Sequence, residues 1–168
     1  SQAGINELDN LLGKGHGFAT VKPLKLMKKI IQLWCPNHGV VFDPYAGSGT
    51  TGHAVLELNA ETGAQRRFIL VEQGSPERGD KYARSLTQLR LRRAITGERP
   101  GKDGKLKVAA EPLPGGFQFR QLTQKIDSRA VLTMKKEELI DLVITSHWEN
   151  SRRNSVGLIR FENDGYKY

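Results

Sequence analysis

The fold is decided by the stretch Val40-Val41-Phe42-Asp43-Pro44-Tyr45-Ala46-Gly47-Ser48-Gly49-Thr50-Thr51-Gly52. An apolar run that ends in an acid is typical of a short strand, and the glycines of the following turn have no side chain to hold a ligand away from the backbone. Thr50 begins a helix whose first N–H groups point unpaired into the turn and favour an anionic group. The stretch therefore predicts a strand, a tight turn and a helix that together bind a nucleoside cofactor.

The spacing of Gly47, Gly49 and Gly52 also matches a dinucleotide-binding turn, and Glu72 follows at about the distance of a ribose-binding acid. In such a site the first glycine normally follows the strand directly, whereas here Asp43 and the three residues after it intervene. An acid at the strand end would repel a pyrophosphate but suits a ligand with an ammonium group. S-adenosylmethionine carries an ammonium and a sulfonium, so we favour it as the cofactor. A nicotinamide-dependent oxidoreductase is the alternative.

The order of the motifs carries a family resemblance. The turn from Asp43 to Thr51, preceded by Thr20-Val21-Lys22-Pro23 and followed by Phe68-Ile69-Leu70-Val71-Glu72, resembles the cofactor-binding half of amino-group DNA methyltransferases. The order is that of the circularly permuted (beta) class, which includes the modification subunits of type III restriction systems. The resemblance covers residues 18 to 95. It implies an α/β, Rossmann-like S-adenosylmethionine-dependent methyltransferase fold with a mostly parallel sheet, present here in part.

The resemblance also implies cofactor-binding roles for individual residues. Glu72 would bind the ribose hydroxyls, and the end of a strand is where open α/β sheets bind ligands. The segment before the turn would flank the methionine end of the cofactor, and the turn itself would surround the amino-acid moiety. The cofactor-binding set is Thr20, Lys22, Pro23, Asp43, Tyr45, Ala46, Gly47, Ser48, Gly49, Thr50, Thr51 and Glu72.

The catalytic motif of the family is missing from the chain. Amino methyltransferases hold the target amine with an Asp/Asn/Ser-Pro-Pro-aromatic motif and stack the ring on the flipped base, but this sequence has no Pro-Pro pair. In the permuted class that motif would precede residue 1. We therefore expect a C-terminal fragment or split subunit, inactive alone and without a catalytic residue. The parent enzyme would be a site-specific DNA methyltransferase, with adenine N6 preferred over cytosine N4.

Composition limits the other function classes. The chain has 168 residues and a single cysteine, Cys35, so no disulfide framework or cysteine-based zinc site is expected. The four histidines are too scattered for a recognisable metal site. No apolar run approaches the ~20 residues of a membrane span. We expect a soluble, cytoplasmic protein.

The positive charge is concentrated in one segment. The net charge is +8, and a basic segment of this kind favours phosphate backbone, so DNA is the expected partner. The other expected partner is the remaining half or subunit of the methyltransferase, together with a restriction subunit. A nucleic-acid-binding module with a vestigial cofactor fold is the main alternative function. The candidate DNA-binding residues are Arg84, Arg90, Arg92, Arg93, Arg99, Lys102, Lys105 and Lys107.

The chain divides into four predicted parts. Residues 1–17 form a loop that leads in from the N-terminus, 18–96 the S-adenosylmethionine-binding core, 97–116 a basic flexible linker or hairpin, and 117–168 a small α+β extension. Within the core, apolar periodicity predicts a helix over 22–34 whose apolar face consists of Leu24, Met27, Ile30, Ile31 and Trp34, and Trp34 is expected to pack this helix on the sheet. Further helices are predicted over 50–59, 80–96 and 134–146, and strands over 68–71, 106–108, 117–122 and 157–161.

Overall fold

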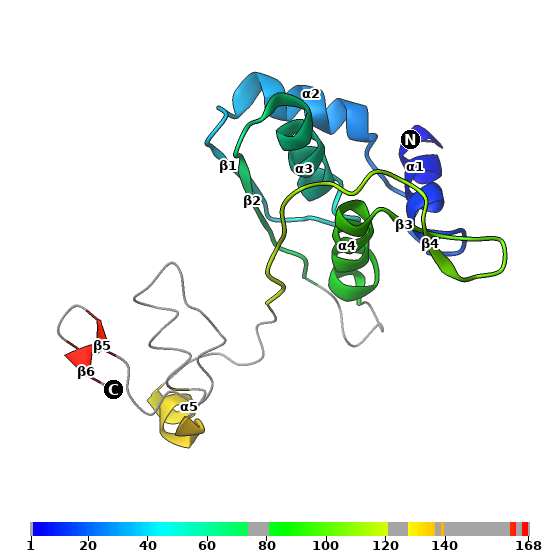
Figure 1. Ribbon diagram of the computed structural model, residues 1–168. Helices are drawn as coiled ribbons and strands as arrows, with labels where there is room; N and C mark the ends of the chain where they lie inside the picture. The colour runs from blue at the N-terminus through cyan, green and yellow to red at the C-terminus, as the bar shows by residue number, and fades with distance from the viewer. Residues whose placement is uncertain are drawn as a thin grey trace. The chain divides into compact units, whose positions relative to one another are not determined.

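The computed structural model describes residues 2–73, 81–120, 128–136, 139, 162–163 and 166–167. The chain divides into two compact units, residues 1–119 and 120–168, which are described separately. In the first unit the elements are α1 (Gln2–Leu12), α2 (Leu24–Trp34), β1 (Val40–Asp43), α3 (Thr50–Thr62), β2 (Arg67–Leu70), the π-helical segment η2 (Ala83–Gln88), α4 (Leu89–Thr96), β3 (Glu98–Pro100) and β4 (Leu106–Val108) (Figure 1).

The strand–helix–strand unit predicted around the glycine turn is confirmed. Strands β1 and β2 are parallel, with Val41 beside Phe68 and Phe42 beside Ile69. Helix α3 connects them, as expected for a crossover between parallel strands. It ends at Gly63, whose φ of +66° is the left-handed conformation that glycine adopts without strain.

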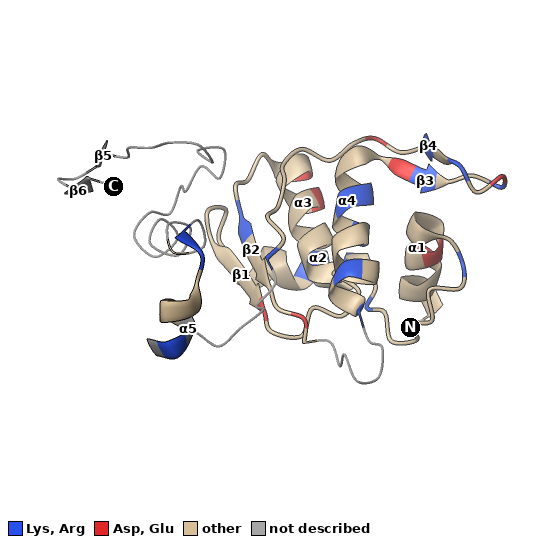
Figure 2. Ribbon diagram, turned by 90° about the horizontal axis from the view of Figure 1, so that it is seen from below, with Lys and Arg blue, Asp and Glu red and all other residues tan. Residues whose placement is uncertain are grey.

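The two faces of this strand pair are covered unequally. Buried residues of α2 and α3 pack together against Val41 and Phe68, so the helices cover one face. The opposite face is exposed; Phe42, for example, is 62% exposed. Figure 2 shows α1 to α4 all on the same side of the strand pair. The exposed face consists of Val40, Phe42, Ile69 and Val71.

The N-terminal segment is a helix and not the predicted loop. Leu8 and Leu11 of α1 are buried, and Leu8 packs with Val21 and Leu86 in a second core cluster. Helix α1 also supports α2, because the Glu7 carboxylate accepts a hydrogen bond of 2.8 Å from the Leu24 amide. The helix is thus stabilised by residues distant in the sequence, and weak local periodicity was a poor guide to it.

Helix α2 confirms the predicted helix and most of its predicted apolar face, because Leu24 and Met27 pack against the core cluster that contains Ile31. Pro23 precedes its first residue, as expected at a helix start. Ile31 is buried, whereas Ile30 is exposed and Trp34 is 83% exposed. The prediction that Trp34 packs on the sheet was wrong, and Ile30 does not take part in the buried face either, since the core contacts only the side of the helix that carries Leu24, Met27 and Ile31.

The remaining predictions have mixed outcomes. The predicted hairpin is confirmed by the antiparallel pairing of β3 with β4, whereas residues 117–120 form no strand. In the second unit, α5 spans Ser128–Thr133, and β5 (Glu162–Asn163) pairs with β6 (Tyr166–Lys167). The helix predicted over 134–146 lies largely outside the described residues, as the strand over 157–161 does entirely. Among the described residues, no helix has the length and apolar character that a membrane span requires.

The contact between α1 and the segment before α2 leads to a stability prediction. A Cβ added at Gly4 would lie 2.4 Å from the Val21 carbonyl oxygen. Alanine normally stabilises a helix by about 1 kcal/mol over glycine, but overpacking against backbone costs roughly 1–3 kcal/mol. We therefore expect Gly4→Ala to lower the free energy of unfolding, measured by urea denaturation.

The matched control is Gly116→Ala, because a Cβ there would meet no atom within 4 Å. This control should leave the urea midpoint nearly unchanged. A Gly4→Ala variant more stable than the wild type would show that α1 does not pack as described.

Candidate cofactor site

The glycine turn is attached to the ends of both parallel strands. The backbone carbonyl of Asp43 accepts a 2.9 Å hydrogen bond from the Val71 amide, and the Val71 carbonyl accepts one of 2.9 Å from the Ala46 amide. The chain therefore stays paired with the end of β2 after β1 has ended. The carboxyl ends of the strands and the turn form one connected edge, which is the edge that binds ligands in open α/β sheets.

The Asp43 side chain organises the start of the turn. Its Oδ1 accepts a 3.0 Å hydrogen bond from the Tyr45 amide, and its Oδ2 accepts one of 2.5 Å from the Thr51 hydroxyl. One carboxylate thus joins the end of β1 to the first turn of α3. A carboxylate has about four acceptor positions, so these two bonds leave it the capacity to accept from a ligand.

A second carboxylate lies on the other side of the turn. The Gly47 amide donates to Glu72 Oε2 over 2.5 Å. Asp43 and Glu72, from neighbouring strand ends, therefore both hydrogen-bond to the segment between β1 and α3. Such an arrangement favours a ligand that carries hydroxyl or ammonium donors.

The glycines of the turn are required by its geometry. Gly47 and Gly49 have φ angles of +52° and +76°, in the region that favours glycine. A Cβ at Gly47 would lie 3.1 Å from the Phe18 ring, and one at Gly49 would lie 3.2 Å from Thr87. The turn is therefore closely packed on its inner side.

Phe18 and Thr87 are site residues that the sequence interpretation missed. The Thr87 hydroxyl donates to the Gly47 carbonyl over 2.6 Å, and the Phe18 ring meets that of Tyr82 edge to face at 5.1 Å. Phe18 lies just before the Lys22-Pro23 motif in the sequence, and this proximity was an indication that it could belong to the site. Thr87 lies within a basic segment, and nothing in the pattern distinguished it.

A buried polar cluster lies beneath the first turn of α3. Arg90 of α4 is only 1% exposed. Its Nη1 donates to Thr50 Oγ1 over 2.8 Å and to Ser48 Oγ over 3.3 Å, while its Nε donates to His53 Nδ1 over 3.3 Å. Ser48, Thr50 and His53 are also buried. The helix start that follows the glycine turn thus rests on a guanidinium group.

Burial shifts the pKa of both basic members of this cluster. Desolvation, reinforced by the charges of Arg90, Arg99 and Lys28, lowers the pKa of His53 to about 3. Desolvation also lowers the pKa of Arg90 to about 10, with Glu7 and Glu57 opposing the shift. At neutral pH, therefore, His53 is neutral and accepts at Nδ1, and Arg90 is charged.

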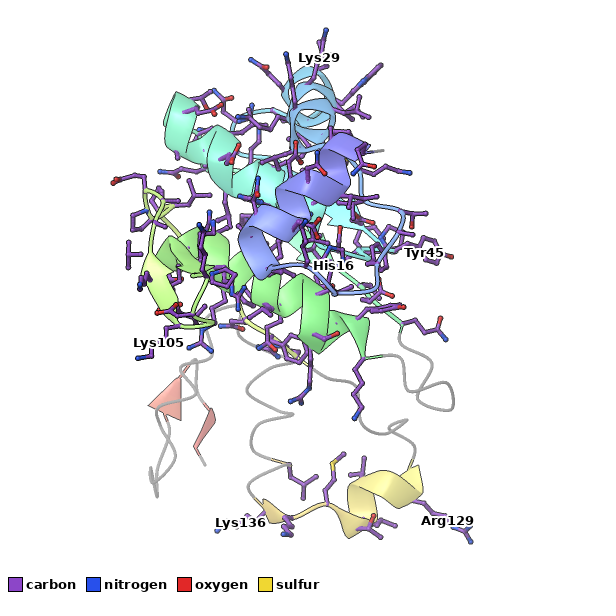
Figure 3. The ribbon with its side chains drawn as sticks, turned by 90° about the vertical axis from the view of Figure 1, so that its right-hand side faces the viewer. His16, Lys29, Tyr45, Lys105, Arg129 and Lys136 are labelled. Carbon is purple, nitrogen blue, oxygen red and sulfur yellow. The ribbon has the colours of Figure 1, made fainter. Side chains whose placement is uncertain are left out.

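The other predicted cofactor residues are more open. Thr20 and Lys22 are exposed, and Pro23 is half-buried at the start of α2. Tyr45 is 84% exposed, and its side chain points away from the ribbon (Figure 3). By contrast, Ala46, Ser48, Thr50 and Thr51 are buried, so their side chains pack inside the turn and are not open to solvent.

The eight candidate DNA-binding residues fall into two groups. Arg90 is buried, which corrects its assignment to a DNA surface. Arg93 and Arg99 are half-buried, and each donates from Nη1 to backbone carbonyls, Arg93 to Leu11 and Arg99 to Arg93 and Glu98. The exposed members are Arg84, Arg92, Lys102, Lys105 and Lys107.

The exposed group extends from η2, which carries Arg84, along α4 to the β3–β4 hairpin, and Figure 2 shows blue positions on α4 and the hairpin. Lys105 lies on the outside of the ribbon in Figure 3. Arg84 lies over the Phe119 ring, 5.4 Å from its centre, and Lys107 is 3.5 Å from Asp103.

The state of His53 predicts a pH dependence. Its pKa is about 3 in the folded chain, against 6.5 as the ordinary value for histidine, so between these values the unfolded chain binds more protons. The free energy of unfolding should fall as the pH decreases from 6.5 towards 3, by up to about 1.4 kcal/mol per pH unit from this residue. His53→Asn keeps an acceptor for Arg90 without titrating, so urea denaturation across this range should show a shallower decline. Equal slopes for both proteins would contradict the prediction.

Comparison with known proteins agrees with this geometry. Residues 4–77 match the DNA methylase family model. Over 70 residues, 42% of this chain, the sequence is 51% identical to the StyLTI Mod subunit, a type III restriction-modification enzyme subunit of Salmonella typhimurium. It is 31% identical over 109 residues, 61% of this chain, to the EcoP15I Mod subunit of Escherichia coli. Over 62 residues, 37% of this chain, it is 45% identical to the type II methyltransferase M.HindIII of Haemophilus influenzae.

The matched segments make up 11%, 17% and 18% of these relatives. The chain thus corresponds to a small part of each. Its matched segment contains the whole strand–turn–helix–strand unit and Glu72. The chain is therefore similar, over residues 4–77, to the DNA methylase family and to part of the Mod subunits of type III restriction-modification enzymes.

Proposed function

We propose that this chain is the S-adenosylmethionine-binding part of a site-specific DNA methyltransferase that acts on adenine N6. The observation that carries the proposal is the pair of carboxylates, Asp43 and Glu72, which hold the glycine turn between two parallel strand ends. We assign the first unit to the Rossmann-like methyltransferase fold, of which the β1–α3–β2 unit is the cofactor-binding part. S-adenosylmethionine would supply an electrophilic methyl group carried on a sulfonium.

The residues present fit this cofactor. Asp43 would accept from the α-ammonium, and Glu72 would accept from the ribose hydroxyls. The first amides of α3 and the positive end of its dipole favour the cofactor carboxylate. Thr20, Lys22 and Pro23 would flank the methionine end.

A dinucleotide is a poorer fit to the same turn. The Gly47 amide, which a pyrophosphate would need as a donor, is hydrogen-bonded to the Glu72 carboxylate. Asp43 also places a negative charge at the strand end, and both would repel phosphate oxygens. These contacts weigh against the nicotinamide-dependent alternative.

Methyl transfer itself is proposed for a larger assembly. The chain has no Pro-Pro motif to hold a target amine, so it would bind the cofactor and methylate nothing alone. The exposed sheet face of Val40, Phe42, Ile69 and Val71 is a suitable surface for the remaining part of the methyltransferase, because strands in parallel sheets are normally buried on both faces.

DNA is the proposed macromolecular partner. The exposed basic residues Arg92, Lys102, Lys105 and Lys107 supply positive charge on α4 and the β3–β4 hairpin. Among the described residues, Asp103 forms an ion pair with Lys107 and with no other member of this set. Phosphate contacts of this kind strengthen binding without reading sequence. The site recognised would then be determined elsewhere in the assembly.

Calorimetric titration with S-adenosylmethionine and S-adenosylhomocysteine tests the cofactor site. We expect a dissociation constant between about 1 µM and 1 mM, weakened at least about tenfold by Asp43→Ala or Glu72→Ala, as for the loss of a charged hydrogen-bond acceptor. The control is Glu111→Gln, an exposed acid outside the site. A folded chain that binds neither ligand, or binds NADH in their place, would refute the proposal.

The DNA surface is tested by salt-dependent binding to duplex DNA. Replacing Lys102 and Lys105 together with alanine should weaken binding and reduce the slope of log K against log salt by about 1–2, because each phosphate contact contributes about 0.9. The matched control replaces Lys25 and Lys29, which are equally exposed on α2. Equal losses in the two double variants would show that the hairpin is not the DNA surface.

A further inference from the structure

The buried charge of Arg90 is unexplained by packing. The residue lies on α4 two positions from the exposed Arg92, yet it is 1% exposed. Its three hydrogen-bond acceptors, on Ser48, Thr50 and His53, are all uncharged. No ion pair among the described residues includes Arg90. Burial of a guanidinium without a contacting carboxylate destabilises the folded state through desolvation, and a well-packed apolar side chain would not incur this penalty.

The position of this charge suggests its use. Ser48 belongs to the glycine turn, and Thr50 is the first residue of α3. The guanidinium therefore contacts the segment that would face the cofactor, at Ser48 and Thr50, whereas the Asp43 carboxylate contacts the same segment at Tyr45 and Thr51. Salt and water screen a charge inside a protein much less than a charge at the surface. The electric field of the Arg90 guanidinium can therefore act on a ligand bound at the other side of the backbone of the turn.

We propose that Arg90 is a specificity-determining residue that favours the carboxylate of the cofactor's amino-acid moiety through the turn. This inference rests on the proposed cofactor function. Asp43 and Arg90 would then recognise the two ends of a zwitterion, the first by contact with the ammonium and the second by its field at the carboxylate. Its hydrogen bonds to the Ser48 and Thr50 hydroxyls also fix the position of the residues that lead from the glycine turn into α3.

The test compares two ligands that differ only in the carboxylate, S-adenosylhomocysteine and its decarboxylated analogue, by calorimetric titration of the full chain. The wild type should bind S-adenosylhomocysteine more tightly. Arg90→Met and Arg90→Gln should each reduce that preference roughly tenfold, as expected for two charges about 12 Å apart at an effective dielectric constant of about 20. Arg90→Lys should retain it. Arg92→Met is the matched control and should leave the preference unchanged.

A purely structural role predicts a different result. If Arg90 only supports the turn, its replacement would weaken the binding of both ligands equally and leave the preference as in the wild type. That result would overturn the inference. The same conclusion follows if Lys22→Met removes the preference and Arg90→Met does not. A wild-type chain that binds neither ligand would refute the cofactor function itself, and the inference with it.

A second measurement decides the matter if neither neutral variant folds. The preference of the wild type for S-adenosylhomocysteine should change less than about twofold between low and high salt, because a buried charge is poorly screened. A steep fall with salt would place the responsible charge on an exposed side chain, of which Lys22 is one, and overturn the assignment to Arg90.

Discussion

The two hydrogen bonds of the Asp43 carboxylate are the constraint on which the site depends. They tie the backbone after β1 and the first turn of α3 to a single side chain. Glu72 makes the corresponding bond from the end of β2 to the Gly47 amide. Because these donors are neutral, both carboxylates keep their negative charge beside the turn. That charge is what distinguishes this site from glycine-rich turns that bind phosphate.

Helix α3 carries this arrangement into the rest of the unit. Its residues from Thr50 to Leu56 are all buried, which is unusual for a helix on one face of a small sheet. Val55 packs with Ile31 of α2 in the core, while Thr50 and His53 meet Arg90 of α4. The helix that follows the turn is therefore held by apolar packing against α2 and by hydrogen bonds to Arg90. A buried hydrogen-bonded cluster of this kind makes the start of the helix rigid.

Local chemistry explains which parts of the fold were predictable. The strands, the glycine turn and the β3–β4 hairpin follow from apolar runs and turn residues that are adjacent in the chain. Helix α1 was predicted as a loop, and Trp34 of α2 was wrongly expected to pack on the sheet, since burial of both depends on partners elsewhere in the chain. The apolar stripe of α2 is wider than the surface that α3 covers, so Ile30 and Trp34 remain exposed. Phe18 and Thr87 were missed because their contacts with Gly47 and Gly49 join distant segments.

The sequence by itself determined the chemistry of the turn: two acids at strand ends, and glycines where positive φ angles are required. It could not separate the arginines of one basic segment, because neighbouring charges look alike in a linear pattern. Only the tertiary structure decided that Arg90 lies beneath the turn while Arg92 faces solvent. The reason is that burial of Arg90 depends on Ser48, Thr50 and His53, which the fold brings to α4 from about forty residues away in the chain.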